Sequence, residues 1–115
     1  MSEVYELFQE GRARLARGEV AQAIVPLERA RRQEPAKASI REALGCAYLR
    51  LRRYTEAQAE FEALLELAPN DHYGYYCLGR CQERLGRRKL ARGSYKMATW
   101  LRPGCKDYRD ALDHL

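Results

Sequence analysis

The chain has 115 residues, of which 46% are apolar and 32% charged, with four prolines and a net charge of +5. This length predicts a single domain, and the apolar share favours a folded chain over a disordered one. No run of about 18 apolar residues is present, and the first residues lack the basic and apolar segments of a secretory leader, so we expect no membrane span, no export and a cytoplasmic location.

Apolar periodicity predicts six helices joined by short turns and a short terminal helix. The spacing places them near residues 5–17, 21–33, 39–51, 55–67, 73–85, 89–101 and 106–114. Pro26 falls in the middle of the second helix, where proline costs roughly 3 kcal/mol or kinks the backbone. We therefore expect a local bend between Gln22 and Pro26.

A repeat of 34 residues organises these helices into pairs. Five columns recur in register: Gly11, Gly45, Gly79; Ala23, Ala57, Ala91; Leu27, Phe61, Tyr95; Ala30, Leu64, Ala98; and Pro35, Pro69, Pro103. Glycine costs about 1 kcal/mol relative to alanine inside a helix, so its recurrence predicts close approach of two helices. The prolines end each unit because proline cannot continue a helix. The single domain, 1–115, is thus expected to contain units at 4–37, 38–71 and 72–105 and a cap at 106–115.

The positive charge is concentrated in the third unit. Residues 4–37 carry seven basic and five acidic residues, residues 38–71 carry four and six, and residues 72–105 carry eight and one. The basic cluster of the third unit comprises Arg80, Arg84, Arg87, Arg88, Lys89, Arg92 and Lys96. Such a cluster can meet phosphates or another anionic partner. A solvated helix face is the simpler interpretation, with partial neutralisation by Glu56, Glu60, Glu62 and Glu66.

The thiols and imidazoles give no clear catalytic pattern. The cysteines, expected to be free in a reducing compartment, are Cys46, Cys77, Cys81 and Cys105. Cys77 and Cys81 share a helix face near Cys46, which allows a thiolate metal or redox site, but burial as small packing residues is the simpler explanation. His72 and His114 lack a nucleophile or carboxylate at an informative spacing, so we expect surface or capping histidines, no enzyme activity, no metal and no cofactor.

The repeat columns resemble the tetratricopeptide repeat. The second unit carries Leu44, Gly45, Tyr48, Ala57, Phe61 and Pro69 of that pattern. The third carries Tyr75, Leu78, Gly79, Ala91, Tyr95 and Pro103, with Gln82 at the aromatic position. The first carries Leu7, Gly11, Ala23, Leu27 and Pro35, with Arg14 at the aromatic position. The resemblance implies an all-α fold, a right-handed superhelix of three antiparallel helix pairs with a terminal capping helix.

The resemblance also implies a concave groove, lined by the first helix of each pair, that receives a peptide. The register places on this inner face Tyr5, Phe8, Arg12, Ala16, Ser39, Glu42, Cys46, Arg50, Tyr73, Tyr76, Arg80 and Arg84. Tyrosine and arginine combine large contact area with polar ends, so an acidic or aromatic-containing peptide would suit the groove, with ordinary helix packing as the alternative. The carboxylate clamp of one family subclass is absent, because its positions hold Phe8, Arg12, Ala43, Tyr73 and Cys77.

Two functional hypotheses follow. The first is an adaptor or scaffold module that binds a protein segment in its groove, and the second is a homo-oligomer formed by stacking or swapping of units. Binding of anionic ligands or nucleic acid through the third unit is a less favoured alternative. Trp100 points away from the apolar columns and either covers the terminal helix or marks a convex contact surface.

Overall fold

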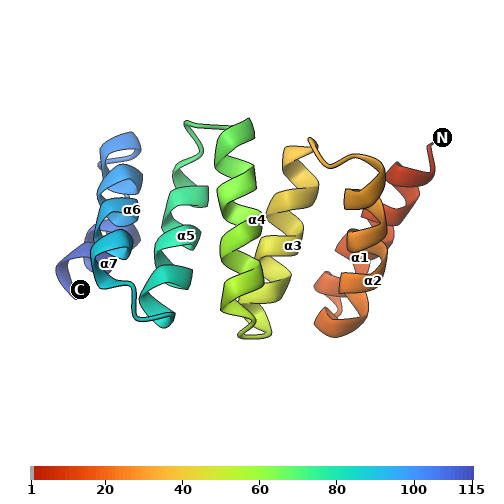
Figure 1. Ribbon diagram of the computed structural model, residues 1–115, viewed down its shortest axis with the longest axis horizontal. Coiled ribbons are helices and arrows are strands. Elements are labelled where there is room, and N and C mark those ends of the chain that lie inside the picture. The colour runs from red at the N-terminus through yellow and green to blue at the C-terminus, as the bar shows by residue number, and fades with distance from the viewer. Residues whose placement is uncertain (1) are drawn as a thin grey trace.

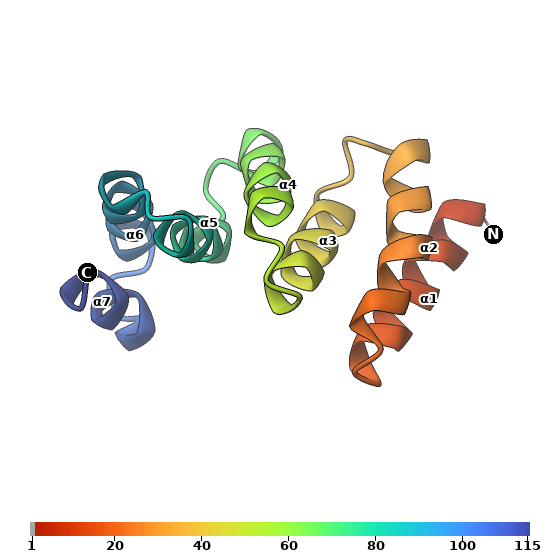
Figure 2. The same cartoon turned by 60° about the horizontal axis from the view of Figure 1, so that its bottom comes forward.

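The computed structural model describes residues 2–115, and every element in that range is a helix. The helices are α1 (Glu3–Ala16), α2 (Val20–Gln33), α3 (Ala38–Arg50), α4 (Tyr54–Leu67), α5 (His72–Arg84), α6 (Arg88–Leu101) and α7 (Lys106–Asp113). They stack along a body of 43 × 24 × 21 Å (Figures 1 and 2). The predicted right-handed superhelix of three antiparallel pairs with a capping helix is confirmed. None of the described helices is both long and apolar enough to cross a membrane.

The helices begin and end where local chemistry favours it. The Ser2 hydroxyl accepts a hydrogen bond from the Tyr5 backbone N–H at 3.2 Å, and the Asp71 carboxylate accepts one from the Gly74 N–H at 2.9 Å. Both are N-cap contacts that satisfy donors left free in the first turn. The observed first and last residues of each helix lie within two residues of the predicted ones.

Glycine against a large side chain sets the closest contact within each helix pair. A Cβ added to the glycine would lie 2.5 Å from Leu27 in the first pair, 2.8 Å from Phe61 in the second and 2.6 Å from Tyr95 in the third. Those three large residues are at most 1% exposed. The predicted close approach of two helices is therefore confirmed, and it leaves no room for a side chain.

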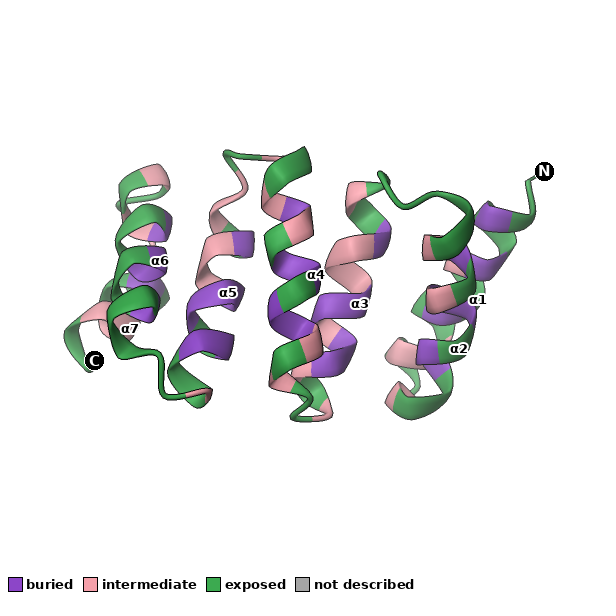
Figure 3. Cartoon of the chain, viewed as in Figure 1, coloured by how far each residue is buried: buried purple, intermediate pink, exposed green. Residues whose placement is uncertain are grey.

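The apolar core passes from one pair to the next and ends at a polar surface on α1. Ile40 and Ala47 of α3 are fully buried, in a core shared with α2. One repeat earlier, the equivalent residues Glu6 and Ala13 are exposed. Figure 3 shows the buried positions of α3 in purple. The first pair thus presents a solvated face where later pairs present a packed one, as a terminal unit of a repeat stack requires.

Pro26 lies inside a continuous helix. α2 runs through it from Val20 to Gln33, and Pro26 itself is buried. A proline removes the N–H that would bond to the carbonyl of Gln22, and Gln22 is exposed, so water can replace that bond. The unit is not broken, while the bend expected between Gln22 and Pro26 stays a prediction.

Candidate functional site

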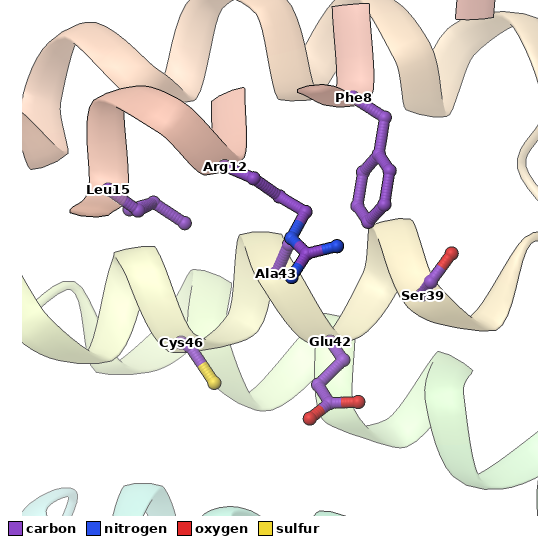
Figure 4. Close-up of a pocket in the computed structure, with 7 residues that line it drawn as sticks. All are labelled: Phe8, Arg12, Leu15, Ser39, Glu42, Ala43 and Cys46. Carbon is purple, nitrogen blue, oxygen red and sulfur yellow. The ribbon is translucent and has the colours of Figure 1, made fainter. Parts of the chain in front are cut away.

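The exposed sides of α1, α3 and α5 carry two hollows, which together we call the groove. The first, of about 390 Å³, lies between α1 and α3 and is lined by Phe8, Arg12, Leu15, Ser39, Glu42, Ala43 and Cys46 (Figure 4). The second, of about 360 Å³, lies at α5 and is lined by Tyr76, Arg80, Glu83, Arg84, Tyr95 and Ala111. Most of the predicted inner-face residues therefore line one of two separate hollows.

An arginine lies over an aromatic ring in each hollow. The Arg12 guanidinium carbon is 5.6 Å from the centre of the Phe8 ring, and that of Arg80 is 5.9 Å from the centre of the Tyr76 ring. Each pair is four residues apart on one helix, and the two pairs are separated by two repeats. Residues with that spacing are neighbours on a helix surface, where a cation and an aromatic face attract each other. The same arginine–aromatic pair thus occurs in the first and third pairs of helices.

The second pair places an acidic residue and a thiol at the same two positions. Glu42 replaces the aromatic residue and Cys46 replaces the arginine. Partial burial raises the pKa of Glu42, and the negative charge of Asp71 raises it further. The middle of the groove therefore differs in charge from its two ends.

Tyr76 is shared between the groove and the core. Its ring centre lies 4.9 Å from that of Tyr108 in α7 and 6.0 Å from that of Tyr95 in α6, and 6.3 Å from that of Tyr73. The Tyr95 hydroxyl donates to Glu83 Oε1 at 2.7 Å, which fixes that carboxylate at the rim. Sequence reasoning missed Tyr95 as a lining residue because it assigned that position wholly to the core. Part of the Tyr76 ring therefore packs between helices, as the alternative of ordinary helix packing predicted.

Four predicted inner-face residues line neither hollow, and one of them is Tyr73 of α5, which is 40% exposed. Tyr5 is 50% exposed at the start of α1, and Ala16 is exposed at its end. The guanidinium of Arg50 lies near the carbonyl oxygen of Leu15, at 3.5 Å, beside the end of α1. Sequence reasoning missed Leu15, although its spacing of three from Arg12 and seven from Phe8 places it on the same helix face.

The cysteines occupy two different environments. Cys77 and Cys81 are fully buried, which confirms their prediction as packing residues, whereas Cys46 is half-buried in the first hollow. A hydrogen bond from the Cys77 thiol lowers the pKa of Cys46, and the same interaction raises the pKa of Cys77. Burial raises the pKa of Cys81 to about 12. Cys46 is therefore the thiol of the three that is best prepared to react.

The basic cluster is spread over two faces rather than neutralised by the second unit. None of its seven residues forms an ion pair within residues 2–115. Glu60 instead binds Arg31 and Arg41, and Glu56 binds Arg53, so the expected neutralisation is wrong. Those glutamates are held by arginines of the first two units. Arg80 and Arg84 line the second hollow, whereas Lys89, Arg92 and Lys96 lie on α6.

The histidines have structural contacts at helix ends. His72 Nε2 accepts from Arg102 at 3.4 Å, so Nδ1–H donates to the Tyr108 hydroxyl at 2.7 Å. This bond ties the start of α5 to α7. His114 is the C-cap residue of α7, with Nδ1 2.6 Å from the carbonyl oxygen of Asp110. The prediction of a capping role is confirmed for His114.

Comparison with known sequences finds a matching family and two distant relatives. The tetratricopeptide repeat family model matches residues 8–57 and 42–104. Superkiller complex protein 3 of Mus musculus is 32% identical over 107 residues, which cover 93% of this chain and 7% of that protein. The Homo sapiens protein of that name is 34% identical over 101 residues, covering 88% and 6%. The chain thus spans less than a tenth of the length of these relatives.

Comparison with solved structures finds the same fold. The first TPR (tetratricopeptide repeat) domain of Spaghetti (RPAP3) bound to HSP90 peptide SRMEEVD has a TM-score of 0.92 at 18% identity, covering 97% of this chain and 89% of that one. MamA 41-end from Desulfovibrio magneticus RS-1 has a TM-score of 0.94 at 22% identity, covering 96% and 63%. The Arabidopsis OM64 TPR domain has a TM-score of 0.91 at 20% identity, covering 96% and 92%.

Proposed function

Because this chain belongs to the tetratricopeptide repeat family, we propose that it is an adaptor whose groove binds an acidic peptide segment of a partner protein. Proteins with this repeat are in general interaction modules rather than catalysts. One neighbour of the same fold holds a peptide, which supports the same class of ligand here. Fold alone does not fix the ligand, so the groove residues must select it.

The observation that carries the proposal is the recurrence of arginine over an aromatic ring in both hollows. In the second hollow, Arg80 and Arg84 have no acidic partner within residues 2–115, so their donors are available to a ligand carboxylate. Arginine forms strong, often two-pronged hydrogen bonds with carboxylates. We assign the second hollow to an acidic side chain of the ligand.

The first hollow suits a different side chain. Phe8, Leu15 and Ala43 supply its apolar wall. The Arg12 side chain lies between Phe8 and Leu15 (Figure 4). Aromatic and arginine side chains are the residues that most often dominate binding energy at interfaces. We assign the first hollow to an aromatic or aliphatic side chain, so the preferred ligand combines an apolar residue with an acidic one.

Selection from a phage-displayed library of random peptides tests this assignment. We expect the enriched peptides to contain Asp or Glu together with an aromatic or large aliphatic residue. Replacing Arg80→Ala and Arg84→Ala together should weaken a selected peptide by about tenfold or more, because hydrogen bonds to charged groups contribute about 1.5–3 kcal/mol each. Arg32→Ala on α2 removes the same kind of exposed side chain far from the groove and should leave affinity unchanged.

Tyr76 is left intact in this experiment, since its ring also packs against Tyr108. Enriched peptides without acidic residues, or equal affinity of the Arg80/Arg84 variant and the native protein, would overturn the assignment. Equal weakening by Arg32→Ala would show that net charge, and not the groove, determines binding.

A further inference from the structure

The outer side of α6 exposes large apolar residues at three positions where the other two pairs have small or polar ones. Leu90 is 56% exposed, Met97 39% and Trp100 79%. One repeat earlier the equivalent residues are Glu56, Ala63 and Glu66, and two repeats earlier they are Gln22, Arg29 and Arg32. The second helices of the first two pairs therefore have small or polar residues at these positions. α6 has a large apolar residue at all three.

A hollow beside Trp100 extends this surface toward α7. It has a volume of about 490 Å³ and is lined by Lys96, Thr99, Trp100, Pro103 and Leu112. The residue of α5 equivalent to Leu112 is Leu78, which is only 8% exposed in the pair formed by α5 and α6. At the equivalent place on α7, Leu112 is half-buried and borders an open hollow. In this fold, such a position on the first helix of a pair is covered by another helix.

Positive charge flanks the apolar surface. Lys89, Arg92 and Lys96 are exposed on α6, and none has an acidic partner within 4.0 Å among residues 2–115. The spacing of 3.6 residues per turn places Lys89, Lys96 and Trp100 on the side of α6 opposite its buried residues. A ligand on this side therefore meets apolar atoms and unpaired positive charges together.

We propose that this outer-α6 surface, formed by Leu90, Met97 and Trp100 with Lys89, Arg92 and Lys96, binds an acidic amphipathic helix of a partner protein. The apolar stripe of the helix covers Trp100 and places one side chain in the hollow beside Leu112, while its carboxylates face Lys89 and Lys96. A hollow that accepts a side chain favours a protein ligand over a flat membrane surface. This site is separate from the groove, whose side chains come mainly from α1, α3 and α5.

The chain itself supplies a suitable probe and a reporter. A synthetic peptide of residues 54–68 reproduces α4, which has four glutamates, no basic residue and the apolar residues Phe61, Leu64, Leu65 and Leu67. Trp100 is the single tryptophan of the protein, so its emission reports directly on this surface. We expect the peptide to shift that emission to shorter wavelength with saturation, and we expect added salt to weaken binding because exposed charges are screened.

Matched variants locate the binding site. Lys96→Glu should weaken the peptide by about tenfold or more, because it replaces an attractive charge by a repulsive one at close range. Arg32→Glu makes the same charge change on α2 and should have no effect beyond a small general one. A peptide whose four glutamates are replaced by glutamine should bind more weakly than the native peptide.

Three results would overturn the inference. One is a Trp100 emission that the peptide does not change at any concentration reached. Another is sedimentation that shows self-association lost on Trp100→Ala, which would assign the surface to a second copy of the chain. The third is a blue shift of Trp100 on anionic phosphatidylserine vesicles without any response to the peptide, which would assign it to a membrane. Failure of the groove experiment alone would leave this surface unaffected, since the groove variants leave it intact.

Discussion

Phe61 lies directly against the backbone of Gly45. A Cβ at position 45 would lie 2.8 Å from the ring atom Cζ, closer than side chains tolerate. Phe61 is fully buried, so its ring cannot turn aside without disturbing the core. This contact sets the distance between α3 and α4, and equivalent contacts occur in the other two pairs.

Gly45→Ala should lower the free energy of unfolding by about 1–3 kcal/mol, because the added methyl overpacks the core. Alanine favours a helix by about 1 kcal/mol over glycine, so intrinsic propensity predicts the opposite sign. Gly93→Ala, in α6, is the control, since nothing lies within 4 Å of a Cβ there; it should stabilise the protein. Urea unfolding measures both, and a Gly45→Ala variant as stable as the native protein would refute the contact.

Arg52→Gly should raise the free energy of unfolding by about 1 kcal/mol. Arg52 has a φ of 60°, whereas the equivalent turn residues Gly18 and Gly86 have φ of 80° and 77°. A left-handed backbone costs a non-glycine residue roughly 1–2 kcal/mol, and glycine relieves most of it. Thermal unfolding of Arg52→Gly beside Arg52→Ala, which removes the same charge but keeps a Cβ, separates this effect from the loss of a charge. A stability gain from the second variant alone would contradict it.

Glu60 is an acidic residue that the core tolerates because two arginines bind it. It is 4% exposed and pairs with Arg31 and with Arg41 Nη1, the latter at 3.0 Å. Replacing both arginines by alanine leaves a buried charge without a partner and should cost about 3–5 kcal/mol. Adding Glu60→Met removes that charge at similar volume and should restore most of the loss. Urea unfolding of the double and triple variants measures both effects. A triple variant no more stable than the double one would show that the unpaired charge of Glu60 does not cause the loss.

High pH should weaken the fold through Tyr48. Burial, together with the hydrogen bond that its hydroxyl donates to the carboxylate of Glu28, raises its pKa from the ordinary 10 to about 12. The folded state keeps the proton longer than the unfolded state, so the stability contribution is complete below pH 10 and decreases as the pH rises toward about 12. Tyr48→Phe should reduce this decrease, measured as the slope of unfolding free energy against pH. An unchanged slope would show that Tyr48 does not titrate in this range.

Cys46 should react with an alkylating reagent before Cys77 and Cys81. Replacing Cys77→Ala removes the interaction that lowers the pKa of Cys46, so the thiolate fraction and the alkylation rate at neutral pH should fall. Cys81→Ala makes the same change at a neighbouring buried thiol and should leave the Cys46 rate nearly unchanged. Mass spectrometry of the labelled residue gives the rates. Faster labelling of Cys77 in the native protein would contradict this order.

Periodicity was sufficient for the helices because burial repeats with the chain. Ala57, Phe61 and Leu64 recur at helical spacing and are at most 1% exposed, so the same apolar pattern that forms α4 also determines its buried side. The groove was less predictable. The register assigned Phe8 and Arg80 correctly to the face of the first helices, but a register gives the direction of a side chain and not its contacts.

The repeat explains where three of the four prolines and most of the net charge of +5 lie. The sequence by itself determined that much: three units, their helix pairs and a basic third unit. Only the tertiary structure decided how those charges are used. It pairs Glu60 with arginines of other helices and exposes Trp100 beside α7. It also places Arg80 and Lys96 on different faces, where neither has an acidic partner among the residues that the structure describes. The physical reason is the separation along the chain between the residues that interact. Helix formation depends on residues three or four apart, whereas an ion pair or a hollow depends on side chains that meet only after the pairs have stacked.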